Sequence, residues 1–121
     1  MPLSATNKVV YEVPKPKPQD ILKDLYLAFK RDFEAYQYAV SLGKLRKYIM
    51  LILETEGCRD SDFASELTES ILCRINESIS NQQMRRLILS EKAFHEAIHE
   101  QALSVYESVE APHLYNVSPK Q

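Results

Sequence analysis

The chain has 121 residues, of which 45% are hydrophobic and 26% charged, and its formal net charge is -2. This length has room for one domain of roughly 90 to 100 residues with short tails, and the composition excludes disorder of the whole chain. No apolar run approaches the ~20 residues of a membrane span and the start has no secretion signal, so we expect a cytoplasmic or otherwise intracellular protein, not a secreted one.

The prolines divide the chain into three parts. All six lie outside residues 19–111, and an interior proline breaks a helix. The sequence therefore predicts a helical domain over residues 19–111, between an extended N-terminal arm (1–18) and a C-terminal tail (112–121). In the arm, "KVVYEV" has the β-branched content of a strand, and "PKPKPQD" favours an extended chain. The arm could bind a partner as an added strand or in an aromatic groove, or could be a leader with a stiff spacer.

Apolar residues at three- and four-residue steps predict a first helix over about 19–42, and Gly43 then stands at a helix C-cap position. A second, strongly apolar helix follows over 44–56, before Gly57, and we expect it to be central. The apolar residues are Leu22, Leu25, Phe29, Phe33, Tyr36 and Val40 in the first helix, and Leu45, Tyr48, Ile49, Ile52 and Leu53 in the second.

A third helix is predicted after Asp60, whose carboxylate can cap it. Its apolar residues recur every four positions. Ser80 and Gln83 then fit a capping box, which indicates a separate fourth helix; a helix continuous through Asn81 is the alternative. The apolar residues of the third helix are Phe63, Leu67, Ile71, Ile75 and Ile79.

Glu91 decides how the last helical segment begins. In an unbroken helix it would lie on the apolar face with Phe94, and burying an unpaired carboxylate is costly. We therefore expect a break near Ser90, with its hydroxyl capping a last helix that runs from Glu91 to about residue 110. Pairing of Glu91 with Arg85 or Arg86 is the alternative. The predicted fold class is an all-α bundle of four or five helices with an extended Pro-rich N-terminal arm.

The stretch "HEAIH" over residues 95–99 resembles the zinc-binding motif of zincin peptidases, but the resemblance covers these five residues only. His95 and His99 could reach one zinc ion, with Glu96 as general base and His113 as the only plausible third ligand. The charged continuation after His99 and the absence of a predicted sheet argue against a peptidase. We therefore predict no catalytic residues, no metal and no cofactor.

The cysteines and glycines exclude other chemistry. Cys58 and Cys73 are too few for a disulfide framework, so we expect free thiols, with Cys73 packed within a helix. Gly43 and Gly57 cannot form a Gly-rich phosphate loop.

Charge is distributed unevenly, since residues 1–50 carry nine Lys or Arg against five Asp or Glu, and residues 51–121 carry six against twelve. Such asymmetry can steer a partner. Two basic clusters leave a nucleic-acid partner open as an alternative, with Tyr48 nearby for stacking, although the clusters are small. They consist of Lys44, Arg46 and Lys47, and of Arg85 and Arg86.

Tails and helices without catalytic motifs favour a non-enzymatic protein-interaction or assembly subunit of a larger complex, bound to a protein partner or to a further copy of itself. Tyrosine is enriched at interface hot spots, although a core or solvated tyrosine is an equal alternative. The candidate partner-binding residues are Tyr11, Val13, Pro14, Pro16, Pro18, Tyr26, Tyr36 and Tyr38.

Overall fold

The computed structural model of the protein describes the backbone of residues 16–117 and the side chains of residues 16–109. Over this part of the chain it has five helices and no strand, which confirms the predicted all-α bundle. Most of the predicted arm and the last four residues of the predicted tail lie outside the described residues. The helices are α2 (Pro18–Glu34), α3 (Tyr38–Thr55), α4 (Ser61–Ser78), α5 (Asn81–Leu87) and α6 (Glu91–Val117).

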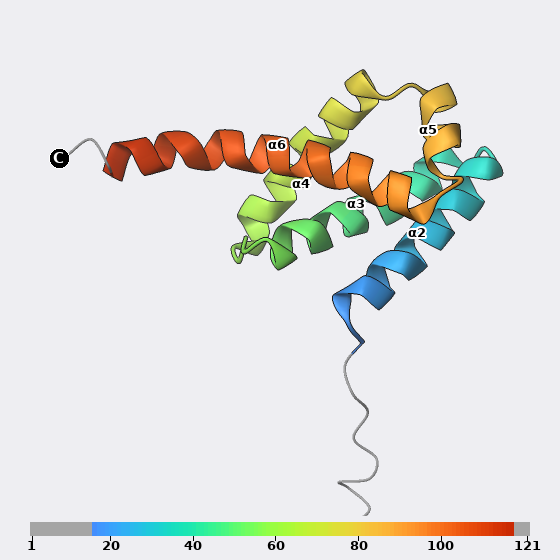
Figure 1. The fold of residues 1–121 in the computed structure, drawn as a ribbon, viewed down its shortest axis with the longest axis horizontal. Coiled ribbons are helices and arrows are strands. Elements are labelled where there is room, and N and C mark those ends of the chain that lie inside the picture. The colour runs from blue at the N-terminus through green and yellow to red at the C-terminus, as the bar shows by residue number, and fades with distance from the viewer. Residues whose placement is uncertain (1–15, 118–121) are drawn as a thin grey trace, which may run out of the picture.

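Helices α2 and α3 form an antiparallel hairpin, and α4 turns back beside α3 (Figure 1). The short α5 leads into the long α6, which lies across the other helices. Among the residues that the structure describes, no helix combines the length and the apolar character that crossing a bilayer requires.

The centre of the core lies under the first half of α6. Phe94, Ile98 and Ala102 are fully buried along one face of this helix. The Phe94 ring lies 5.4 Å from the ring of Tyr26 on α2 and 5.2 Å from that of Tyr48 on α3, measured between centroids. Aromatic packing at such distances adds to the burial of apolar area, so α6 holds the α2–α3 hairpin together.

The predicted first helix over 19–42 is wrong, because the chain turns at residues 35–37. Tyr36 has a positive φ of 62°, and α3 begins at Tyr38. Gly43 therefore lies inside α3 and caps nothing, whereas Gly57, with φ of 104°, follows the end of α3 as predicted. The apolar stripe continues across the turn, which is why periodicity alone did not reveal the break.

The later turns agree with the prediction. The Asp60 carboxylate accepts hydrogen bonds from the backbone of Asp62 and Phe63 at the start of α4. Ser80 and Gln83 form the predicted capping box of α5, so the alternative of a helix continuous through Asn81 is wrong.

The break before Glu91 is also confirmed. The Ser90 hydroxyl accepts from the Ala93 amide, and Glu91 is exposed in the first turn of α6.

The end of α6 differs from the prediction, since the helix passes Pro112 and continues to Val117. An interior proline removes one backbone hydrogen bond and its ring displaces the carbonyl four residues earlier, which can bend a helix without ending it, so it is a weak marker of the boundary. The helical segment therefore includes residues 112–117 of the predicted tail.

Candidate interaction surface

A groove of about 690 Å³ lies where the start of α2, the second half of α3 and the start of α4 meet. We name it the α2–α3–α4 groove. Its floor is apolar, because half-buried side chains from α2 and α3 face a gap that no other helix of the described part fills. The apolar lining consists of Ile21, Leu25, Met50, Leu51 and Ala64, with the buried Cys58 beside them.

The charge at the rim of the groove is mainly positive. Arg46, Lys47 and Arg59 line it against a single acidic residue, Glu54. Arg46 also pairs with Glu69 on α4, with 2.7 Å between its Nε and a carboxylate oxygen. Within the described residues neither Lys47 nor Arg59 forms an ion pair, so both cations remain available to a ligand at this rim.

A sequence signal for this groove lies in the apolar run of residues 48–53. Tyr48 to Leu53 are six consecutive apolar residues, and a helix can turn only part of its circumference toward one core. Tyr48, Ile49, Ile52 and Leu53 are buried, and Met50 and Leu51 are the two that line the groove. Arg59, in a loop, carried no such signal.

The described end of the predicted arm is close in sequence to the groove, since Ile21 lies in the first turn of α2. Pro16 and Pro18 are exposed there, with Pro18 as the first residue of the helix, a position where proline is well tolerated. Tyr11, Val13 and Pro14 lie outside the described residues.

The candidate tyrosines have three different environments. Tyr26 is a core residue, 5% exposed, and its hydroxyl donates to the Ile88 carbonyl at 2.6 Å, so its place among the partner-binding residues is wrong. Tyr36 is 68% exposed at the α2–α3 turn. Tyr38 is half-buried, and its hydroxyl accepts from Arg85 at 3.0 Å. The Arg85 guanidinium lies 5.2 Å from the Tyr36 ring centroid, so the two tyrosines and this arginine form one aromatic corner.

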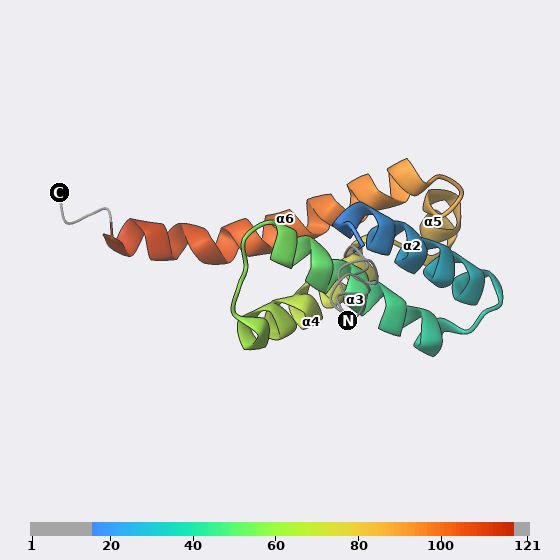
Figure 2. The same cartoon turned by 90° about the horizontal axis from the view of Figure 1, so that it is seen from below.

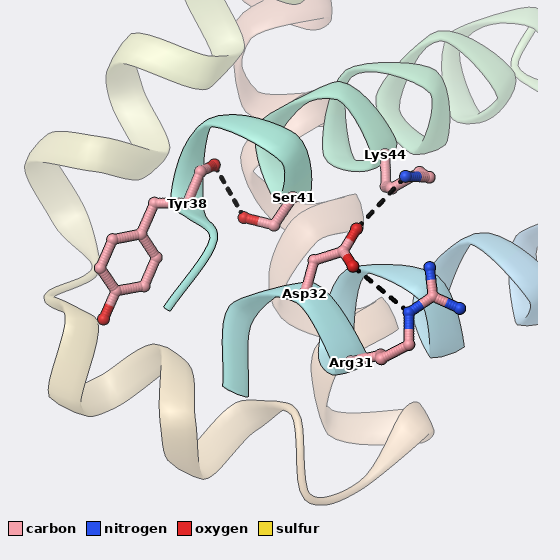
Figure 3. Close-up of polar contacts among 5 residues, drawn as sticks. All are labelled: Arg31, Asp32, Tyr38, Ser41 and Lys44. Atoms are coloured by element: carbon pink, nitrogen blue, oxygen red, sulfur yellow. Dashed lines mark hydrogen bonds and ion pairs between the residues drawn. The ribbon is translucent and has the colours of Figure 1, made fainter. Parts of the chain in front are cut away.

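The basic clusters are partly occupied by contacts within the protein. The Lys44 ammonium lies 3.2 Å from the buried Asp32 carboxylate, which Arg31 approaches from the other side (Figure 3). Burial raises the pKa of Asp32, but the hydrogen bonds from Lys44 and Arg31 outweigh it and leave this pKa below its usual value. Arg85 is engaged by the aromatic corner, while Arg86 and Lys47 are exposed. No described contact joins the α3 cluster to Arg85 and Arg86.

The two histidines of "HEAIH" bind side chains of α3 and the loop after it. His95 Nδ1 lies 2.7 Å from the hydroxyl of the buried Tyr48, and His99 Nε2 lies 3.1 Å from the Glu56 carboxylate. Their rings stack with centroids 5.3 Å apart, and Glu96 is exposed. Among the described residues, no three His, Cys, Asp or Glu side chains gather as metal ligands; the side chain of His113 lies outside this part.

Burial shifts the pKa values of His95 on α6 and of Tyr48 on α3. It lowers the pKa of His95, with a further contribution from neighbouring His99. Burial also raises the pKa of Tyr48. Both shifts favour the neutral forms of the two side chains, and the hydrogen bond between them joins α3 to α6.

The cysteines differ in exposure. Cys58 is buried at the groove, whereas Cys73 is exposed on α4, so the prediction that Cys73 packs inside is wrong. Helical periodicity explains the difference, because the core face of α4 is formed by Leu67, Ile71 and Ile75, and position 73 lies between two of them on the other side.

Comparison of the chain with protein-family models, with curated protein sequences and with solved structures finds no match in any of the three.

Proposed function

We propose that this chain is a non-enzymatic protein-interaction subunit that binds an amphipathic, acidic helix of a partner in its α2–α3–α4 groove. The observation that carries the proposal is the combination of an apolar floor with a basic rim. A helix laid into such a groove buries its apolar face against the floor, and its flanking carboxylates meet the cations of the rim.

The apolar floor and the basic rim would contribute differently to recognition. Burial of the exposed parts of Leu25, Met50 and Leu51 would supply affinity, since removal of apolar area from water is the main favourable term in association. Lys47 and Arg59 would select an acidic sequence over a basic one and would fix its direction, because charges at a rim affect specificity and association rate more than affinity.

The two alternative functions have less support. For a nucleic-acid binder, Lys44 and Arg46 already have the carboxylates of Asp32 and Glu69 as partners, which reduces the charge available to phosphates. For a zinc peptidase, Tyr48 lies at hydrogen-bonding distance from His95, the residue that would bind the metal.

Selection of helical peptides from a random displayed library on the immobilised chain tests the proposal. We expect selected peptides to carry Asp or Glu beside apolar residues at three- and four-residue spacing. In fluorescence anisotropy, Lys47→Glu with Arg59→Glu should weaken their binding at least about tenfold, because like charges would face each other at the rim.

The matched control changes the same number of charges elsewhere. Lys23→Glu with Lys92→Glu alters two exposed lysines that do not line the groove, and binding should stay within about twofold. Selected peptides without acidic residues, or equal losses for the two double variants, would contradict the proposal.

A further inference from the structure

The far end of α6 leaves the bundle. Figures 1 and 2 show, in two perpendicular views, that its last turns extend beyond the other helices with none of them alongside. Among the residues of α6 whose side chains the structure describes, Ala102 is the last that is fully buried, and Val105 is half-buried. Glu107 and Val109 are exposed. Burial therefore decreases along α6 as far as residue 109, and the backbone stays helical to Val117.

Within the described part of the chain, no other helix packs along this projecting end. From residue 107 to residue 117 it extends for about 16 Å at the rise of an α-helix. A stretch this short has little helical stability of its own in water and normally depends on packing of one face. It is therefore suited to being covered by another molecule.

The sequence of α6 gives this end a definite charge. After Lys92 the sequence has no Lys or Arg until Lys120, and two glutamates, at positions 107 and 110, lie in the projecting end. The projecting end thus carries only acidic and neutral residues, with exposed Val109 among them. This is the composition that the α2–α3–α4 groove fits, because the floor of the groove is apolar and its rim is basic.

Other segments of the same chain fit the groove less well. The arm carries Lys8, Lys15 and Lys17 against Glu12, so its charge repeats that of the rim. The end of α6 cannot reach its own groove, because it continues in one helix from the part packed in the bundle. A second copy of the chain can supply that end without any change in the fold.

We infer that the projecting end of α6 in one copy binds the α2–α3–α4 groove of a second copy. This inference rests on the proposed function and names the partner of the groove. The contact joins two different surfaces, so it is head-to-tail, and repetition produces rings or open chains of subunits. Each added copy leaves one groove and one helix end available, which makes the growth dependent on protein concentration.

Sedimentation velocity on the full chain over a concentration series tests this inference. The sedimentation coefficient of the wild type should rise with concentration. Lys47→Glu with Arg59→Glu in the groove, and Glu107→Lys with Ser108→Lys on the helix end, should each weaken association at least about tenfold. The control pair Lys23→Glu and Lys92→Glu should change it less than about twofold.

Mixing the two defective double variants gives the sharper result. Unlike copies can then form both the native contact and the charge-exchanged contact, so an equimolar mixture should regain the concentration-dependent association that each variant alone has lost. A chain with all four substitutions should regain much of the association, since its groove rim is then acidic and its helix end, with lysines at positions 107 and 108, is more basic.

Two outcomes would overturn the inference: a wild type that stays monomeric to about 1 mM, or an association that neither double variant weakens. If the chain stays monomeric while acidic peptides still bind the groove, the proposed function stands and only the second copy is excluded as partner. If neither peptides nor a second copy binds the groove, both proposals fail.

Discussion

The turns that connect the helices are stabilised in two different ways. At Ser80 and Ser90, a hydroxyl accepts a hydrogen bond from a backbone amide three residues further on. At the turn between α2 and α3, no side chain caps α3, and Tyr36 adopts a left-handed backbone that a side chain disfavours. The first kind of turn is stabilised locally, whereas the second has a conformational cost of its own.

Contacts between distant residues offset that cost. Lys44 reaches Asp32 across twelve positions of sequence, and Arg85 reaches Tyr38 across forty-seven. Arg85 also lies over the ring of Tyr36 itself. The hairpin that carries one side of the α2–α3–α4 groove is therefore positioned by tertiary contacts, whereas α5 and the start of α6 are each stabilised by a local cap.

Asp32→Asn is the change that we expect to have the largest effect. Asparagine keeps the shape of the side chain but leaves Lys44 and Arg31 without a counter-charge beside a buried position. The melting temperature should fall by more than it does for loss of either serine cap, and Asp24→Asn, at an exposed site of the same helix, should change it little.

Melting temperatures of the wild type and of Asp32→Asn, measured down to acidic pH, give a second readout. Because the folded pKa of Asp32 lies below its usual 3.8, its contribution to stability is present above that pH and is lost as pH falls further. The variant should lose this part of the acid sensitivity. An Asp32→Asn chain as stable as the wild type would show that the α2–α3 turn does not depend on this pair.

The distinction between locally capped turns and a turn held by distant residues explains how much of the fold could be predicted from the sequence. The capping box at Ser80 and the break before Glu91 involve residues three positions apart, and both were predicted. The turn at Tyr36 was missed, because its stabilising partner Arg85 is remote in sequence and a tyrosine is not a usual residue for a left-handed position.

The candidate site could be predicted only in part, for the same reason. Lys47 was recognised as basic, yet its combination with Arg59 requires that the end of α3 and the start of α4 face one gap. Tyr26 was assigned to a surface because the prediction had no information about the Ile88 carbonyl that its hydroxyl binds. Residue types were visible in the sequence, whereas their juxtaposition depends on the packing of helices.

Ser80→Ala tests the local kind of turn. Loss of its hydroxyl removes the acceptor for the Gln83 amide, and the free energy of unfolding should fall by about 1 kcal/mol, the usual cost of an N-cap. Urea unfolding measures this value, with the exposed Ser70→Ala on α4 as control. If Ser80→Ala lowered stability as much as Asp32→Asn does, the two turns would not differ in how strongly they depend on distant contacts.

Gly43→Ala tests where the first turn lies, and its expected effect is a small gain. Inside α3 an alanine loses less conformational freedom on folding than glycine, and a Cβ at this position meets no atom within 4 Å. We expect stability to rise by about 0.5–1 kcal/mol. Gly57→Ala should be destabilising instead, because φ is 104° there. A loss at position 43 would indicate a helix end at that glycine.

The smallest effect that we expect concerns pH, and it tests a third contact between distant residues. His95 lies against Tyr48, and burial lowers its pKa from the usual 6.5. Below pH 6.5 the unfolded chain therefore binds a proton at this residue more readily than the folded chain does, so stability should decrease as pH falls.

His95→Gln keeps a hydrogen-bonding group next to Tyr48 but does not titrate. Urea unfolding between about pH 7.5 and pH 5 should show a shallower slope for this variant than for the wild type. Lys92→Gln, exposed on the same helix, should keep the wild-type slope, and a parallel slope for His95→Gln would mean that the histidine is protonated equally in both states.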